Sequence, residues 1–334
     1  MPTAFRFWAA AAMAILGLAS CGKKGAFVAT CVDDERIPAG ERREIDATAL
    51  NFTQDLLANY VVALSKFWDD SRSKDADDRQ LEAIEKSVIG TMHPTNPRVA
   101  HSYLVRSYAG SPGRMLCAVD LKRADGWVSM KAIPAAEQAH VLLTADARNN
   151  QWTLDVWLIH QKEQWKVHSF WINLSSLGAL DSEALWVRGR EEASGGHRIN
   201  AALLLTAAAQ VANRGPAFQL GLAQAIAKDL AAIDLPSEIS GKAPFRWNWN
   251  GTTFNVIQVG PIALAGKLYV LLVQRQPAGK SPQELDASNH RLIDFFKHRF
   301  PEYHGVFSGI AARSADPSGH SGFATIDESA LTKS

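Results

Sequence analysis

The stretch AHVLLTADARNNQWTLDVWLIHQKEQWKVHSFWINL, residues 139–174, alternates apolar and polar side chains over most of its length. A period of two is typical of β-strands, because successive side chains point to opposite faces of a sheet. Turn-forming residues interrupt the alternation at Asn149-Asn150 and again at residues 162–164. The stretch therefore predicts three antiparallel strands joined by tight turns.

The middle strand of this stretch has one continuous apolar face, which ends in a histidine. By parity, Asp155 lies on the opposite face of the same strand. Strand tryptophans are commonly core residues, but a face of this kind can also line a ligand site. We predict that the ligand or partner contacts come from this face: Trp152, Leu154, Val156, Leu158 and His160.

Helices and further strands are expected before this stretch. Residues 47–68 carry apolar side chains at three- and four-residue steps, which predicts an amphipathic helix, and residues 78–90 predict a second one. Segments near residues 99–108, 115–121 and 126–133 can add strands to the same sheet. The fold class expected from this order of elements is α+β.

Helices followed by a tryptophan-rich meander, which closes on Trp165, Val167 and Phe170, resemble the nuclear transport factor two-like superfamily, also called SnoaL-like. The resemblance covers residues 45–178. It implies a curved antiparallel sheet, wrapped around helices into a cone, with a cavity at the wide end. In enzymes of that superfamily a histidine or aspartate inside the cavity acts as a general acid or base.

Two further regions follow the proposed cone. Residues 179–235 are rich in alanine and predict a helical connector of two or three helices, with stops at Gly195-Gly196 and Gly215-Pro216. Residues 244–326 predict a small α+β domain, with a hairpin at Asn250-Gly251 and a helix that begins at Ser281-Pro282. We expect the cone and this domain to fold as separate units, and residues 327–334 to form a disordered tail.

The N-terminus has the form of a secretory signal: Arg6, then an apolar run over residues 7–18 that is shorter than a membrane span. Leu18-Ala19-Ser20-Cys21 resembles the lipobox of bacterial lipoproteins, in which the cysteine becomes the acylated first residue. The resemblance implies a signal peptide at residues 1–20, lipidation with palmitate at Cys21, a tether over residues 21–44, and a periplasm-facing location in the cell envelope. An ordinary signal peptide cleaved near Ser20 is the alternative. Gly22 in place of an aspartate favours the outer over the inner membrane.

Charge and cysteine content exclude several classes of function. Lys plus Arg total 35 and Asp plus Glu total 34, so the chain has no net field that would attract nucleic acid. Besides Cys21 only Cys31 and Cys117 remain, which leaves two possibilities open: one disulfide bridge or two separate thiols. Two cysteines give no metal-ligand spacing, and we expect no metal and no cofactor.

The sequence contains no G-x-S-x-G, no Walker loop, no H-E-x-x-H and no paired C-x-x-C, which excludes only the families that these motifs mark. His140, His160 and His168 fall in the predicted meander. His160 is the best placed as a candidate catalytic residue, because it shares a face with the apolar residues of the middle strand. A hydrogen-bonded or solvated histidine at a strand end is the alternative. No acid–base pair can be matched within the strand, so the sequence favours a protein that binds an envelope protein partner or an apolar ligand over a small SnoaL-like isomerase or hydrolase.

Overall fold

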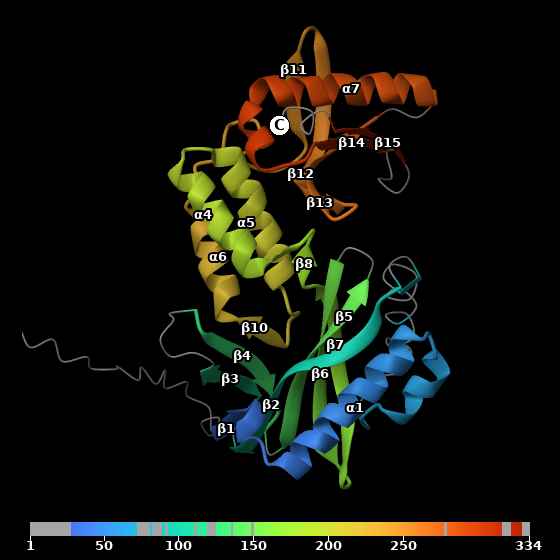
Figure 1. Cartoon of the computed structure of the whole chain (residues 1–334), viewed down its shortest axis with the longest axis vertical. Coiled ribbons are helices and arrows are strands. Elements are labelled where there is room, and N and C mark those ends of the chain that lie inside the picture. Colours follow the sequence, from blue (N-terminus) through green and yellow to red (C-terminus); the bar gives the residue numbers. More distant parts are fainter. Residues whose placement is uncertain are drawn as a thin grey trace, which may run out of the picture.

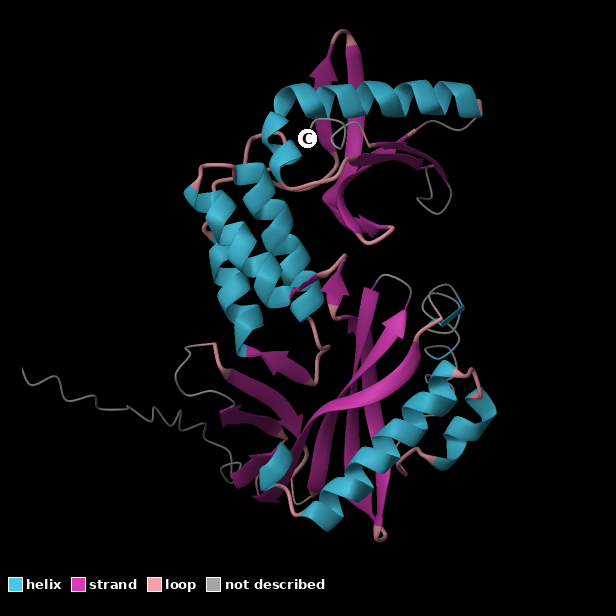
Figure 2. Ribbon diagram, viewed as in Figure 1, coloured by secondary structure: helices cyan, strands magenta, loops and turns pink. Residues whose placement is uncertain are grey.

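The computed structural model describes residues 28–71, 81, 89–90, 93–109, 112–118, 125–134, 136–147, 150–276, 279–315 and 322–328. Within these residues the fold is α+β, as expected, and its sheets are mostly antiparallel. Two sheet-containing bodies lie at opposite ends of the long axis, with helices between them on one side (Figures 1 and 2). The predicted second helix at residues 78–90 lies largely outside the described residues, and so does Cys21.

A five-stranded antiparallel sheet forms the centre of the N-terminal body. Its strand order is β1-β2-β5-β6-β7, and its strands span Val28–Asp33, Thr95–Ala109, Glu137–Ala147, Asn150–Gln161 and Gln164–Leu174. The last three are the strands that the alternating stretch predicted. Val141 pairs with Val156, and Val156 pairs with Phe170, so the apolar positions of the three strands share one face.

Helix α1 (Ala39–Leu57) lies across that apolar face (Figure 1). Its buried residues Ile45, Ala49, Phe52 and Leu56 recur at helical spacing and pack in one core cluster with the strands. The sequence predicted a helix at residues 47–68. The chain instead leaves the α-helix at Ala58 and continues as a 3₁₀ helix, η2 (Val61–Lys66).

The ordered fold begins earlier than the sequence indicated. Part of the expected tether, residues 21–44, forms β1, a short 3₁₀ helix η1 (Asp34–Arg36) and the first turn and a half of α1. The reason is pairing with a remote segment, since β1 runs antiparallel to β2, with Cys31 opposite Val105. Ile37, which the sequence placed in the tether, is 3% exposed.

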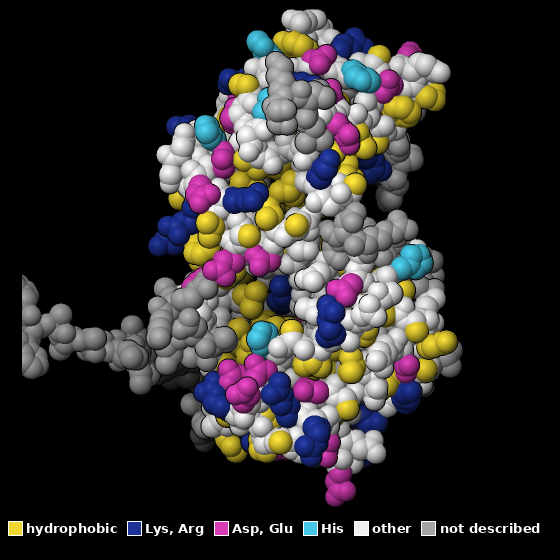
Figure 3. Space-filling view, in the orientation of Figure 1, with side chains coloured by type: hydrophobic (Ala, Val, Ile, Leu, Met, Phe, Trp, Pro, Cys, Tyr) yellow, Lys and Arg dark blue, Asp and Glu magenta, His cyan; other side chains and the backbone are white. Residues whose placement is uncertain are grey.

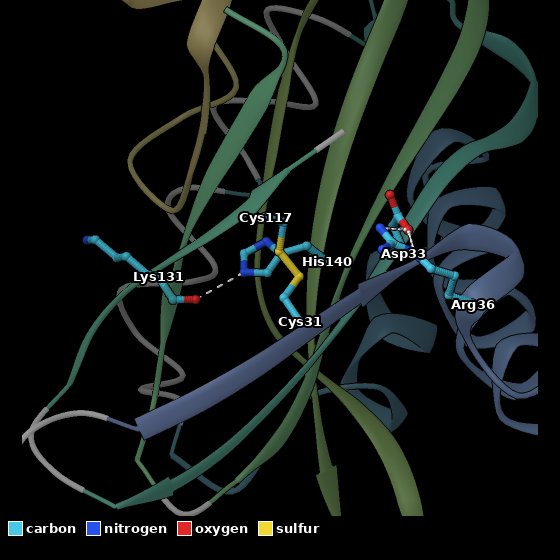
Figure 4. The surroundings of a disulfide bond; sticks show 6 residues. All are labelled: Cys31, Asp33, Arg36, Cys117, Lys131 and His140. Atoms are coloured by element: carbon cyan, nitrogen blue, oxygen red, sulfur yellow. Dashed lines mark hydrogen bonds and ion pairs between the residues drawn. A yellow bond between two sulfur atoms is a disulfide. The ribbon is translucent and has the colours of Figure 1, made fainter. Parts of the chain in front are cut away.

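A second, three-stranded sheet covers the other face of the five-stranded sheet. Its order is β10-β4-β3, from Phe218–Leu220, Trp127–Ala132 and Gly113–Ala118. The two sheets enclose a core cluster that includes Tyr103, Met130 and Phe218. A disulfide between Cys31 in β1 and Cys117 in β3 joins them at one edge, which settles the alternative that the sequence left open (Figure 4).

Helices α4 (Ser182–Ser194), α5 (Arg198–Ala212) and α6 (Gly221–Ala231) follow β7, after the short strands β8 (Ser176–Leu177) and β9 (Leu180–Asp181). Asp181 caps α4 by accepting a hydrogen bond of 2.8 Å from the Ala184 amide. Small residues let α4 and α5 approach closely: a Cβ at Gly189 would lie 2.9 Å from the Leu205 side chain. This agrees with the alanine-rich composition of the segment.

The C-terminal body is a five-stranded sheet with one helix on a face. Its strands follow the order β11 (Phe245–Trp249), β12 (Thr252–Leu264), β13 (Lys267–Arg275), β14 (Ile310–Ala315) and β15 (Gly322–Asp327). The β11–β12 hairpin turns at Asn250-Gly251, both with positive φ, as predicted. Helix α7 (Pro282–Arg299) starts in a capping box at Ser281, leads into η4 (Pro301–Gly305), and makes the β13–β14 crossover parallel.

The helices and the C-terminal sheet share one core. A single cluster contains Leu204 and Ala207 of α5 together with Phe254 of β12 and Leu292 of α7. The division that the sequence suggested, with a connector separate from the C-terminal domain, therefore does not follow the packing. Apolar positions on one face of α5 require a partner, and the sheet supplies it.

Candidate binding site

Four of the five predicted contact residues lie in the core under α1. Leu154, Val156 and Leu158 are fully buried and Trp152 is 7% exposed, and all four pack in the cluster that α1 completes. The apolar face of β6 is therefore a packing face between sheet and helix. The alternation of apolar and polar residues predicted correctly which side chains share a face. It does not distinguish a face buried in the core from one that lines a ligand site.

His160, the fifth predicted residue, lies at the end of β6, where its ring is 5.0 Å from the ring of Trp165. Its side chain is 33% exposed, and its Nδ1 is 3.4 Å from Glu137 Oε2 on the neighbouring strand. The other carboxylate oxygen of Glu137 accepts a hydrogen bond of 2.8 Å from Arg106 Nε. This hydrogen bond raises the pKa of Arg106, so Glu137 is held as a partner of the guanidinium. The sequence missed Glu137 because the pairing crosses strands.

Asp155, which lies on the opposite face of β6 from His160, is instead paired with His140. His140 in β5 and Asp155 in β6 meet between the two N-terminal sheets, with 3.1 Å between Nδ1 and Oδ1. His140 Nε2 is 3.3 Å from the carbonyl oxygen of Lys131 in β4 (Figure 4). The histidine is 0% exposed and Asp155 is 3% exposed. The His140–Asp155 pair is therefore closed to any substrate.

Arg214, in the segment between α5 and β10, adds a cation beside this pair. Burial lowers the pKa of its guanidinium to about 10, although the charge of Asp155 acts to raise it. Its Nη1 also donates to the carbonyl oxygens of Val211 and Asn213, at the C-terminal end of α5. Arg214 thus joins the helices to the face of the five-stranded sheet that carries Asp155.

A third histidine, His168 in β7, forms a cluster with Asp69 and Ser71. Its Nδ1 is 2.6 Å from Asp69 Oδ2 and 3.5 Å from Ser71 Oγ, and Ser71 Oγ also donates to Asp69 Oδ1 over 2.8 Å. A nucleophilic triad needs the serine and the carboxylate on different ring nitrogens. Here both face the same nitrogen, so the cluster cannot relay a proton from the serine.

An open hollow of about 550 Å³ lies where the three-stranded sheet meets the helices. Trp127 at the start of β4 and Trp186 of α4 give it two indole rings, both half-buried. Gly221, the first residue of α6, allows the close approach, since a Cβ there would lie 2.8 Å from the Trp127 ring. The other lining residues are Asp125, Arg190, Gln224, Ala225, Lys228 and Asp229.

One hydrogen bond and one cation–π contact hold the indole of Trp186 in this hollow. Trp186 Nε1 donates to Asp229 Oδ2 over 2.7 Å, and the Arg190 guanidinium lies 5.1 Å from the centre of the Trp186 ring. Arg190 Nε is also 3.7 Å from the same carboxylate oxygen. Arg190 and Asp229 also line a neighbouring hollow of about 390 Å³, together with Arg198 and Asp234. We call these two adjacent hollows together the α4–α6 hollow.

The α4–α6 hollow is balanced in charge, because two carboxylates and two cations line its larger part. Figure 3 likewise shows acidic and basic side chains intermixed over the visible face of the molecule. This site could not be found from the sequence, because its residues come from three separate segments, at 125–127, 186–190 and 221–229. The one feature of the sequence that could have indicated the site is an aromatic residue on the outer side of a predicted helix, as at Trp186.

Among the described residues, no cluster of histidine, cysteine, aspartate and glutamate is arranged to hold a metal ion. None of the helices in the described part of the chain is long and apolar enough to cross a membrane. Comparison with known proteins gives no match to any family model, to any curated protein or to any solved structure.

Proposed function

We propose that this chain is a lipid-anchored protein of the bacterial cell envelope, which binds an apolar molecule or a side chain of a partner protein in the α4–α6 hollow. Lipidation at Cys21, and the outer membrane as its location, are proposed from the lipobox resemblance. The Cys31–Cys117 disulfide supports an oxidising compartment, because such bonds persist outside the reducing cytosol.

We also propose that residues 45–178 form a SnoaL-like cone, to which α4–α6 are joined as a helical connector. The position of α1 against the sheet and the bulge between Trp157 and Leu158 support this proposal. On the α1 side of the sheet, where such a cone would keep its cavity, Phe52, Leu64 and Phe170 pack in one core cluster. A cone filled by its own chain favours binding elsewhere on the molecule.

One observation carries the preference for binding over turnover. The His140–Asp155 pair, which has the geometry of an acid–base pair, is sealed in the core. Among the described residues, the open α4–α6 hollow is lined by two indole rings and by no histidine. Catalysis needs a positioned acid, base or nucleophile within reach of the substrate. A concave site with aromatic walls and a few polar groups holds a ligand without such a group.

A dye-binding measurement tests the site. The mature soluble form, from Gly22 onward, is titrated with 1-anilinonaphthalene-8-sulfonate, whose rings suit the indoles and whose anion suits Arg190 and Lys228. We expect Trp186→Ala to weaken dye binding about tenfold, which corresponds to about 1.4 kcal/mol. Trp249→Ala is the matched control, because Trp249 is also a half-buried tryptophan but packs on His298 in the C-terminal body. Equal affinities of the two variants would count against the hollow.

A small SnoaL-like isomerase or hydrolase is the second candidate function, and the partly exposed His160–Glu137 pair is the observation that favours it. The soluble form is screened against a panel of esters and isomerisable ketones. Turnover that is lost in both His160→Ala and Glu137→Gln, and retained in His290→Ala, would replace the binding proposal. His290 is a suitable control because it is an exposed histidine that also faces a carboxylate, that of Asp286.

A further inference from the structure

The larger part of the α4–α6 hollow extends along one face of α6. Five α6 residues line it at helical spacing, which places them on the same side of the helix: Gly221, Gln224, Ala225, Lys228 and Asp229. In Figure 1, α6 starts beside the three-stranded sheet and runs next to α4. At a rise of about 1.5 Å per residue, Gly221 and Lys228 lie about 11 Å apart along the helix axis. The lining of the hollow is therefore elongated.

The end of the hollow at Gly221 is aromatic. The ring of Trp127 lies so close to Gly221 that an added Cβ would be 2.8 Å from its Nε1 and Cε2 atoms. Asp125 lies at this end too, since its carbonyl oxygen faces Gly221. The second indole, that of Trp186, lies further along α6, where its Nε1 donates to Asp229. Aromatic surface is thus available at both ends of the lining.

The end of the hollow at Lys228 has more positive than negative charge. Lys228 and Arg190 line this end together with a single carboxylate, that of Asp229. Asp229 Oδ2 already accepts a hydrogen bond of 2.7 Å from Trp186 Nε1, and it lies 3.7 Å from Arg190 Nε. Lys228 is exposed, and no described residue forms an ion pair or a hydrogen bond with its ammonium group. Positive charge is therefore available to a ligand at this end.

The volume and the charges of the hollow together limit what it can hold. A volume of about 550 Å³ is in the range of sites that bind small molecules. A wholly apolar occupant would remove water from Lys228 and Arg190 and offer no hydrogen bond in return, which is costly. A ligand with an anionic group at one end offsets this cost, because its oxygens can accept hydrogen bonds from these cations.

Resting on the binding function proposed for this hollow, we propose that its ligand is a small, elongated apolar molecule with one anionic group. The apolar part lies against Trp127 and Trp186, and the anion lies at Lys228 and Arg190. A carboxylate and a phosphate monoester share the required chemistry, because each presents charged oxygens at the end of an apolar body. The ligand class is thereby narrowed to amphiphilic anions.

Two dyes that share their rings and differ in charge test the proposal. 1-Anilinonaphthalene-8-sulfonate carries an anionic group, whereas N-phenyl-1-naphthylamine has the same rings without it. Both are titrated into the mature soluble form, from Gly22 onward. We expect Lys228→Gln to weaken binding of the anionic dye about fivefold and to leave the neutral dye unchanged. Lys267→Gln is the matched control, because Lys267 is also an exposed lysine but lies at the start of β13 in the C-terminal body.

Displacement of the neutral dye identifies the anionic group. Decanoate, decyl phosphate and decanol have the same apolar chain and differ only in the group at its end. We expect decanoate or decyl phosphate to displace the dye at a concentration about tenfold lower than decanol does. The more effective of the two anions then indicates whether the ligand is a carboxylate or a phosphate ester. Displacement by decanol at the same concentration as by both anions would overturn the proposal.

The outcomes separate this inference from the binding function on which it rests. Trp186→Ala should weaken both dyes, because the indole contacts their rings. If it does so while Lys228→Gln weakens neither, the anionic ligand is overturned and the hollow remains a binding site. If Trp186→Ala weakens neither dye, the proposed function of the hollow is overturned together with this inference.

Discussion

At the scale of single residues, the buried ionisable groups between the two N-terminal sheets are the most sensitive positions. Asp155 is 3% exposed and lies 3.1 Å from His140 Nδ1, and its charge acts to raise the pKa of Arg214. A buried charge is costly to desolvate, and its partners offset that cost. A substitution that removes one charge leaves the other buried without a partner. The loss in the free energy of unfolding should therefore exceed the small net contribution of the intact pair.

Asp155→Asn should therefore lower the free energy of unfolding by about 3 kcal/mol, which urea denaturation measures at pH 7. The control is Asp234→Asn. Asp234 Oδ2 also pairs with an arginine, Arg198 Nη1 at 2.6 Å, but its side chain is 81% exposed. Solvent screens such a pair, and its loss should cost less than about 1 kcal/mol. Losses of equal size would show that Asp155 is not part of a buried charge cluster.

Tyr303 gives a pH-dependent prediction. Its side chain is 0% exposed, its hydroxyl contacts no hydrogen-bonding group in the described residues, and burial raises its pKa to about 12. Because the folded pKa lies above the ordinary value of 10, the fold favours the protonated phenol. The stability that this adds is complete below pH 10 and is lost as pH rises from 10 to about 12.

Tyr303→Phe should raise the free energy of unfolding by about 1 kcal/mol at pH 7, because an unpaired buried hydroxyl is removed. The gain over the wild type should be larger at pH 11, since phenylalanine does not ionise. Tyr269→Phe is the control, as it removes a hydroxyl that donates to Glu328 Oε1 over 2.8 Å and should cost about 1 kcal/mol at pH 7. The midpoints of urea unfolding at pH 7 and pH 11 measure both effects. A Tyr303→Phe variant less stable than the wild type would show that the Tyr303 hydroxyl is not an unpaired buried group.

At the scale of elements, the segment between α5 and β10 determines how the helices meet the five-stranded sheet. Asn173 of β7 donates to the carbonyl oxygens of Gln210 and Asn213, which caps the end of α5. Gly215 follows with φ +81°, against the ring of Trp171. Only glycine satisfies both the positive φ and the close contact, because a Cβ would lie 2.5 Å from Trp171 Cγ.

Gly215→Ala should accordingly lower the free energy of unfolding by about 3 kcal/mol, from backbone strain and overlap with Trp171. Gly251→Ala separates the two causes, since Gly251 has φ +74° but no atom within 4 Å of its added Cβ. Strain alone should cost about 1 kcal/mol there. Thermal or urea unfolding measures both variants, and similar losses would mean that the contact with Trp171 contributes nothing.

Elements whose signals are local were predictable from the sequence. The alternation of residues 139–174, the Asn250-Gly251 turn and the Ser281 capping box each act over a few residues, and each formed as expected. Features that join remote segments were not predictable. β1 depends on β2, the His140–Asp155 pair crosses strands, and the α4–α6 hollow combines three segments. A single sequence contains the periodicity of each strand but not the identity of its neighbour.

At the scale of the whole molecule, three core clusters group into two bodies, which divide the chain at a different place from the one that composition suggested. One body holds α1 and both N-terminal sheets, and the other holds α4–α6 and the C-terminal sheet. Residues 218–220 cross over, because β10 pairs with β4 of the first body. The helices therefore belong to the core of one body while their connecting segment completes a sheet of the other.

This division predicts which fragments fold. Helix α5 packs in the same core cluster as the C-terminal sheet. Asn200 of α5 also donates a hydrogen bond of 2.7 Å to the Glu302 carbonyl oxygen. A fragment of residues 244–328 would expose that apolar surface, so we expect it to bind anilinonaphthalene sulfonate and to unfold without a cooperative transition. A fragment of residues 182–328 keeps the helices and should unfold cooperatively in urea. Cooperative unfolding of both fragments at the same midpoint would instead support the independent C-terminal domain that the sequence suggested.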